Sequence, residues 1–270
     1  METASNQDKF FDTTMQLVGT LAKLPVVRVD RNTFLSNKFS KSPHLSQIIS
    51  EGPLSVYTAN EIQKMALDVV NESTYKTSFA SFVSGLPSNP LTMVAAGGAD
   101  IVQYFGFALN MAQQIAYLFG DAELFDENLI ALSESEKARV VALLAGMCGV
   151  AGASNLIIKT SITAGQAIGK QVASKALTKT TWYPLLKKVA NMLGKTITKK
   201  TVEKTISKAI PVIGGGVSGA LTYFTFRPMG KQLVDIYYGI VTNKLLDDVS
   251  QETVVGVTQD AVQSEDGSVF

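Results

Sequence analysis

Three long stretches of this sequence carry almost no charge, and they restrict what the chain can fold into. Ala209 to Phe226 has 18 residues and no charge, Val140 to Ile158 has 19 and none, and Leu91 to Gly120 has 30 with Asp100 as its single charge. Water does not accept so much contiguous apolar surface. We therefore expect a helical core, a partner or a lipid bilayer to cover these stretches.

Composition and periodicity favour a helical core. The 270 residues are 46% hydrophobic and 17% charged, which is less charge than the roughly 25% usual in soluble domains. Apolar residues recur at helical spacing, for example at Ile62, Met65, Ala66, Val69 and Val70. The sequence predicts an all-α fold, a compact multi-helix bundle in which Gly-rich apolar helices pack closely. We expect an N-terminal arm with short accessory elements (1–57), a helical domain (58–246) and a flexible acidic tail (247–270).

Three capping boxes indicate where helices begin. They run from Thr58 to Glu61, from Asp100 to Gln103 and from Ser133 to Glu136, each with a short polar residue followed three positions later by Glu or Gln. The second predicted helix ends at Gly120. Asp100 is interpreted as the cap of that helix, with a buried carboxylate in proton or ion chemistry as the alternative.

Four further segments give local expectations. Val27, Val29 and Phe34 are compatible with a strand or an extended arm, and the six acids between residues 121 and 136 predict a solvated connection. The stretch from Val140 to Ile158 is interpreted as one closely packed helix, with a membrane span as the alternative. Residues 227–230 are predicted to close one segment before a last helix begins.

Glycines interrupt two of the uncharged stretches, and small residues at such positions let a second helix approach closely. The predicted packing glycines are Gly146, Gly149, Gly152, Gly214, Gly215, Gly216 and Gly219. Three of them also spell G-x-G-x-x-G, the fingerprint of a dinucleotide fold. Only 51 residues follow Gly219, without alternating strands and helices. We therefore expect no nucleotide and no other cofactor.

The chain has one cysteine, Cys148, and one histidine, His44. This excludes an intrachain disulfide and a zinc site of the Cys/His kind. We expect Cys148 to be a small buried residue and His44 a solvated loop residue. No catalytic constellation and no metal site is predicted; an enzyme of unrecognised type is an alternative, with Asp100 as its candidate residue.

Positive charge is concentrated between Lys159 and Lys208, where eleven lysines stand against one acid, Glu203. Apolar residues recur among them at roughly helical spacing, as in basic amphipathic helices that bind anionic membrane surfaces. A solvated lysine face is the alternative. The net charge of +1 gives no reason to expect nucleic acid. The predicted surface consists of Lys170, Lys175, Lys179, Trp182, Lys187, Lys188, Lys195, Lys199 and Lys200.

Several short motifs follow one another along the chain. They are Gly85-Leu-Pro, Gly97-Gly-Ala-Asp, Tyr117-Leu-Phe-Gly, the Gly-rich helix, the lysine-rich region, Ile210-Pro-Val-Ile-Gly-Gly-Gly and Pro228-Met-Gly. Their order resembles that in the EcsC family of bacterial proteins. The resemblance covers roughly Ser81 to Tyr238. It implies a helical, membrane-associated cytoplasmic protein, and it brings no catalytic residues.

The expected function is that of a non-enzymatic peripheral membrane protein. It would bind the anionic inner face of the bacterial cell membrane, or a membrane protein, through the lysine-rich region. We expect a cytoplasmic location because the N-terminus lacks a secretory signal. The alternative is a soluble helical domain that binds a lipid or another apolar ligand in a glycine-lined interior. In that case Gln103, Asn110, Gln113, Gln114 and Tyr117 would form a polar stripe facing the cavity.

Overall fold

The computed structural model describes residues 27–84, 99–125, 132–161, 184–186, 188 and 216–242. Within these ranges all regular structure is helical, which confirms the predicted all-α fold. The elements are α2 (Arg31–Lys38), α3 (Leu45–Glu51), the 3-10 turn η1 (Pro53–Ser55), α4 (Ala59–Ser84), α6 (Ala99–Leu118), α7 (Glu134–Met147), α8 (Ala153–Thr160) and α12 (Gly216–Val241). The predicted tail lies outside the described residues.

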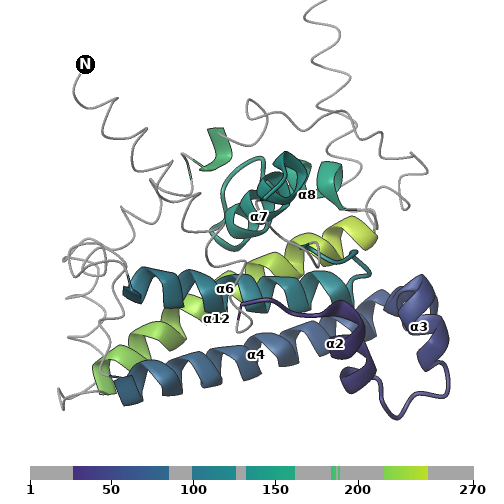
Figure 1. The fold of residues 1–270 in the computed structure, drawn as a ribbon, viewed down its shortest axis with the longest axis horizontal. Helices are drawn as coiled ribbons and strands as arrows, with labels where there is room; N and C mark the ends of the chain where they lie inside the picture. Colours follow the sequence, from purple (N-terminus) through teal and green to yellow (C-terminus); the bar gives the residue numbers. More distant parts are fainter. Residues whose placement is uncertain are drawn as a thin grey trace, which may run out of the picture.

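Three long helices form the body of the fold. Figure 1 shows α4, α6 and α12 side by side, with α7 and α8 on one side of them and α2 and α3 near the start of α4. The most extensive interface joins α4 and α12. These two helices run antiparallel, because Asn60 contacts Tyr238 and Asn71 contacts Arg227.

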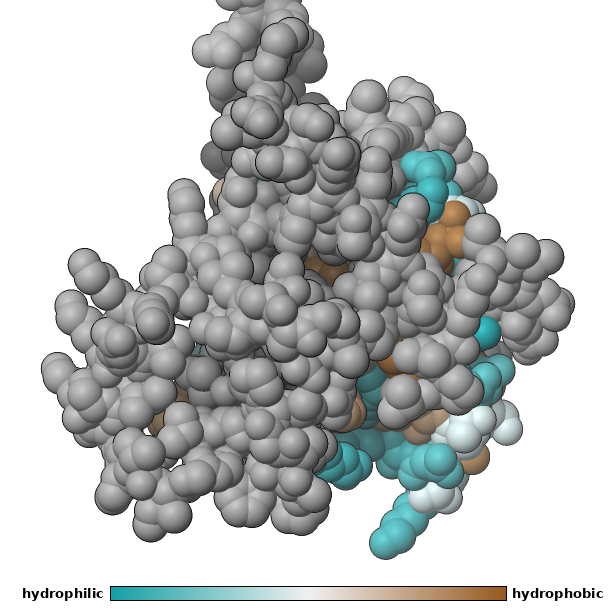
Figure 2. Space-filling model, turned by 60° about the vertical axis from the view of Figure 1, so that its left-hand side comes forward, coloured by the Kyte–Doolittle hydropathy of each residue, from teal (hydrophilic) through white to brown (hydrophobic). Residues whose placement is uncertain are grey.

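One continuous hydrophobic core connects these helices. The predicted face of α4 is correct: Ile62, Ala66, Val69 and Val70 are buried, and Met65 is partly buried against them. The same core includes Leu35 of α2, Phe39 directly after it and Ile48 of α3, together with most of the buried apolar residues of α6, α7, α8 and α12. Ala145, Val150 and Ala153 form a small second cluster where α7 turns into α8. On the face drawn in Figure 2, described hydrophobic residues reach the surface between hydrophilic ones.

Two of the predicted capping boxes are present. The Glu61 amide donates to the Thr58 hydroxyl oxygen (3.3 Å), and the Thr58 amide donates to the Glu61 carboxylate (2.9 Å). Ser133 and Glu136 make the same reciprocal pair at the start of α7. The third box is not tested, because the side chain of Asp100 lies outside the described residues. Asp100 itself belongs to the first turn of α6.

The prediction of one helix from Val140 to Ile158 is wrong. Helix α7 ends at Met147, Gly149 and Gly152 adopt positive φ angles of 66° and 90°, and α8 begins at Ala153. Glycine accepts this left-handed backbone without strain, so the chain folds back on itself. Leu144 and Ile157 then lie in the same core. Because α7 ends at Met147 and α8 begins at Ala153, residues 140–158 do not form the single helix that the membrane-span alternative requires. Among the described helices, none is long and apolar enough to cross a membrane.

Two other local predictions are corrected. Residues 227–230 do not end a helix, because α12 continues through Pro228. Pro228 lies on an exposed face of the helix, one turn after the exposed Phe224, so the proline ring and the bend that it imposes do not disturb the core. Val27 and Val29 lie in a non-helical segment, whereas Phe34 lies inside α2, so the strand interpretation of this segment is wrong.

Candidate functional site

Most of the predicted lysine surface lies outside the described residues. Of its members, only Lys188 has a described side chain, and it is exposed. Lys159, at the start of the lysine-rich region, is exposed in the last turn of α8. The surface therefore stays a prediction. Outside the described residues are Lys170, Lys175, Lys179, Trp182, Lys187, Lys195, Lys199 and Lys200.

The predicted glycines fall into different environments. A Cβ atom on Gly146 would lie 3.0 Å from Ile157 Cδ1 and 3.1 Å from Leu233 Cδ1, so this glycine lies where α7 meets α8 and α12. Gly149 and Gly152 lie in the turn between two helices, not inside a packed helix. Gly216 and Gly219 belong to the backbone of α12, and the side-chain surroundings there are not described. Gly214 and Gly215 lie outside the described residues.

The described members of the predicted polar stripe on α6 bond to the protein itself. Gln113 is fully buried; its amide nitrogen donates to the Val27 carbonyl (2.8 Å), and its amide oxygen accepts from the Val29 backbone (3.2 Å). Gln114 donates to Asn110 (2.6 Å). This part of the stripe therefore fixes the N-terminal segment on α6 and does not line a cavity.

A cluster of buried polar side chains follows α6, and the sequence interpretation missed it. Asp121 is only 3% exposed. Its carboxylate accepts a hydrogen bond from the Tyr237 hydroxyl on α12 (2.6 Å) and one from the Ser161 hydroxyl directly after α8. The prediction of a solvated connection is therefore wrong for the first residues of that segment. Leu124 and Phe125 are buried there as well.

Glu123 extends this cluster toward the N-terminal segment. Its carboxylate accepts from the Tyr117 hydroxyl (3.1 Å) and from the Arg31 backbone N–H (2.8 Å). The Tyr117 oxygen in turn accepts from the Leu124 backbone (3.0 Å). Glu123 thus joins the start of α2 to the end of α6.

Two arginines donate hydrogen bonds to backbone carbonyls of the loop that follows α6. Arg31 donates through Nε to the Asp121 carbonyl (2.9 Å) and through Nη1 to the Ile49 carbonyl (2.9 Å). Arg139 on α7 donates to the carbonyls of Ala122 (2.8 Å) and Glu123 (2.6 Å). Two cations therefore accompany two carboxylates. We call Arg31, Tyr117, Asp121, Glu123, Arg139, Ser161 and Tyr237 the polar hub.

The electrostatics of the hub keep its tyrosines protonated. Burial, followed by the neighbouring Asp121 carboxylate, raises the pKa of Tyr237 well above its usual value. Burial and the Glu123 carboxylate likewise raise the pKa of Tyr117. Outside the hub, burial raises the pKa of the Cys148 thiol to about 12. A raised pKa disfavours the deprotonated, nucleophilic form of each of these three groups.

The geometry of the hub fits a structural role. Ser161 and Tyr237 are each 2% exposed, so a substrate in solvent does not reach their hydroxyls in this arrangement. The hub joins the N-terminal segment, α6, α7, α12 and the end of α8 through one loop. In the described part of the chain, no group of three or more His, Cys, Asp or Glu side chains could hold a metal ion.

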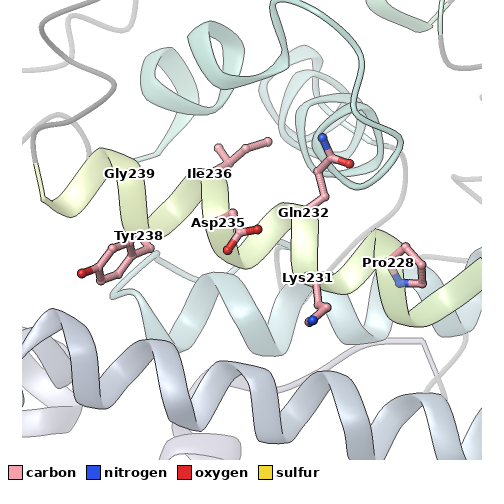
Figure 3. Close-up of a pocket in the computed structure, with 7 residues that line it drawn as sticks. All are labelled: Pro228, Lys231, Gln232, Asp235, Ile236, Tyr238 and Gly239. Atoms are coloured by element: carbon pink, nitrogen blue, oxygen red, sulfur yellow. The ribbon is translucent and has the colours of Figure 1, made fainter.

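An open hollow of about 680 Å³ lies along one helix, α12. Figure 3 shows that its side chains diverge: Gln232 and Ile236 point to one side of α12, and Lys231 points to the other. A ligand site needs a few polar groups that converge on one point, and this hollow does not supply them. Its lining residues are Pro228, Lys231, Gln232, Asp235, Ile236, Tyr238 and Gly239.

Comparison of this chain with family models, with curated proteins and with solved structures finds no match.

Proposed function

We propose that this chain is a non-enzymatic peripheral membrane protein of the EcsC type. It attaches to the anionic inner face of the cell membrane, or to a membrane protein there, through residues 159–208. The observation that carries the proposal is the charge of this region, in which eleven lysines stand against one glutamate. Each lysine near an anionic bilayer contributes about 1 kcal/mol of attraction, so the charges act together.

The described residues at 184–188 support an amphipathic arrangement in this region. Leu186 is buried in the main core and Leu185 is partly buried against it, whereas Lys188 is exposed. Leu185 and Leu186 thus pack on the folded helices while Lys188 reaches solvent.

Packing favours this function over a ligand-binding interior. The space beside Gly146 is filled by Ile157 and Leu233, and the buried amide of Gln113 bonds to the backbone of Val27 and Val29. A lipid would require apolar space at such positions.

Vesicle sedimentation tests the proposal. Replacing Lys187, Lys188, Lys195, Lys199 and Lys200 with Gln removes at most about 5 kcal/mol of attraction, an upper limit of roughly five-thousandfold in partitioning. Salt screening reduces that loss. We expect the wild type to sediment with anionic vesicles at low salt and the variant to sediment far less.

The matched control removes the same charge elsewhere, by replacing Lys38, Lys41, Lys64, Lys137 and Lys231 with Gln. It should retain most of the binding. Equal binding of the two variants, or wild-type binding that ignores lipid charge and salt, would show that the lysine-rich region is only a solvated face.

A further inference from the structure

The register of α4 and α12 can be read from two hydrogen bonds. The Tyr238 hydroxyl donates to the Asn60 side chain (2.6 Å), and Arg227 Nε donates to the Asn71 side chain (3.1 Å). From 60 to 71 and from 227 to 238 are eleven positions each, so the helices keep an antiparallel register over this length. Extending the register by four residues places Tyr75 opposite residue 223, beside Phe224.

Tyr75 and Phe224 are exposed large hydrophobic residues, with 65% and 52% of their surface accessible. Scattered exposed hydrophobic residues are normal in proteins. These two, however, lie at the same level of one helix pair. Both helices therefore expose an aromatic ring at the same position along the helix pair.

The charged residues of α4 end, and those of α12 begin, at nearly the same position along the helix pair. The last charged residue of α4 is Lys76, which pairs with Glu72 (2.9 Å), and the first charged residue of α12 is Arg227. Residues 77–84 of α4 and 216–226 of α12 contain no charge. At 1.5 Å per residue, these helical segments are about 12 Å and about 16 Å long.

The first turns of α6 lie at the same end of the molecule as these two segments. Figure 1 shows the last turns of α4 and the first turns of α6 and α12 at one end of the molecule. Within α6 the only charged residue is Asp100. We call this part of the fold, residues 77–84, 99–105 and 216–226, the uncharged end.

A bilayer interface fits the order of charged residues, exposed aromatic rings and uncharged segments along α4 and α12. Tryptophan and tyrosine concentrate where hydrocarbon meets water, and phenylalanine occurs on the apolar face of helices that lie in the interface. Cations such as Lys76 and Arg227 favour the level just outside it. A length of about 12 to 16 Å is short of the roughly 30 Å of a hydrocarbon core, so the segments fit within one leaflet. A carboxylate is costly at the centre of a bilayer, so Asp100 favours a shallow position.

We propose that the uncharged end inserts into the interfacial region of a lipid bilayer, with Tyr75 and Phe224 at headgroup level. This inference rests on the proposed membrane function and adds a second contact to it. The lysine-rich region attracts the anionic surface from a distance, whereas the uncharged end holds by burying apolar surface. Salt weakens only the first contact.

A tryptophan reporter tests the depth of insertion. The variant Phe224→Trp, in a Trp182→Phe background, is mixed with phosphatidylglycerol and phosphatidylcholine vesicles whose acyl chains carry bromine close to the headgroup. Bromine quenches the indole only at close range. We expect strong quenching relative to unbrominated vesicles. The matched control is His44→Trp in the same background, because His44 is exposed and lies next to α3, far from the uncharged end; it should not be quenched.

Each outcome has a distinct meaning. Sedimentation with vesicles without quenching at position 224 overturns the insertion and leaves the proposed function standing. Absence of sedimentation at low salt overturns both. A dimer without vesicles, with blue-shifted emission from Phe224→Trp, assigns the uncharged end to a second copy of the chain and overturns the insertion.

A paired substitution gives a second measurement. The double variant Tyr75→Asp and Phe224→Asp places two carboxylates at the proposed interface. At high salt, where the lysines contribute little, we expect its vesicle binding to fall by about tenfold or more. Circular dichroism and the thermal midpoint show whether the fold is retained. A folded variant that binds like the wild type overturns the insertion.

Discussion

The two ends of the α4 and α12 pair are built on opposite principles. Near Tyr237, α12 contributes to the polar hub, in which two buried or partly buried carboxylates and two arginines are fixed by hydrogen bonds. At the other end, residues 77–84 and 216–226 contain no charge. One end is therefore held by directed polar contacts, whereas the other contains no charged side chain.

This difference indicates that the hub fixes the arrangement of the helices, whereas the uncharged end is available for binding. A buried charge without its partners is strongly unfavourable, so the hub tolerates few arrangements of the surrounding helices. Apolar side chains tolerate many more arrangements. We therefore expect substitutions in the hub to reduce stability and substitutions at the uncharged end to alter binding instead.

The largest effect is expected from Asp121→Ala. This change leaves the buried hydroxyls of Ser161 and Tyr237 without their acceptor and removes a negative charge close to Arg31 and Arg139. We expect the free energy of unfolding to fall by about 3–5 kcal/mol, measured by urea denaturation. The exposed Asp68→Ala is the control and should stay within about 0.5 kcal/mol of the wild type. A loss below 1 kcal/mol at Asp121 would remove the contrast between the two ends.

The next effect concerns Arg139, which donates to two carbonyls of the loop. Arg139→Met should cost about 2–3 kcal/mol, because hydrogen bonds from a charged donor are stronger than neutral ones. Arg139→Lys keeps the charge but loses the fork geometry, and we expect an intermediate loss. Equal stability of the Lys variant and the wild type would mean that charge alone holds the loop. Urea denaturation of all three proteins decides this.

Alkaline pH should weaken the hub. The pKa values of Tyr117 and Tyr237 are raised in the folded protein, so their protonated forms are favoured by folding. This stability is fully present below the unfolded value near 10 and is lost as pH rises above it. The loss is about 1.4 kcal/mol per pH unit for each tyrosine. Tyr237→Phe should make the decline shallower. An unchanged slope in chemical denaturation between pH 10 and 11 would contradict the burial of this hydroxyl.

The smallest effect is expected at the uncharged end. Tyr75→Ser removes an aromatic ring that is 65% exposed, so the free energy of unfolding should change by less than about 0.5 kcal/mol. Thermal denaturation without lipid is sufficient as the measurement. A loss of several kcal/mol would show that this ring supports the core, and the two ends would then differ less than we propose.

Local signals in the sequence predicted much of the fold. The capping boxes at Thr58 and Ser133 and the apolar face of α4 are confirmed, because each depends on residues within one or two helical turns. The break at Gly149 and Gly152 was not predicted. An uncharged stretch has the same apolar composition whether the helix continues through it or the chain folds back. The path of α12 through Pro228 depends on the exposure of that turn, which periodicity does not reveal.

The polar hub could not be predicted for a different reason. Asp121 looked solvated because it begins an acidic segment, whereas its partners Arg31, Ser161 and Tyr237 lie 40 to 116 positions away in the chain. No local pattern connects them. The lysine-rich region was visible from composition alone, but composition does not give its arrangement.

The pairing of α4 with α12 has a consequence for how the protein is made. Asn60 and Tyr238 are 178 positions apart, and Asn71 and Arg227 are 156 apart. At a synthesis rate of roughly 5–20 residues per second, α4 leaves the ribosome many seconds before its main partner exists. During that interval the apolar face of α4 rests only on nearby segments and is open to chaperones or to a membrane. Loop closure over such distances is also slow. A late-arriving helix thus completes the fold, and translation itself decides when Ile62, Val69 and Val70 become inaccessible.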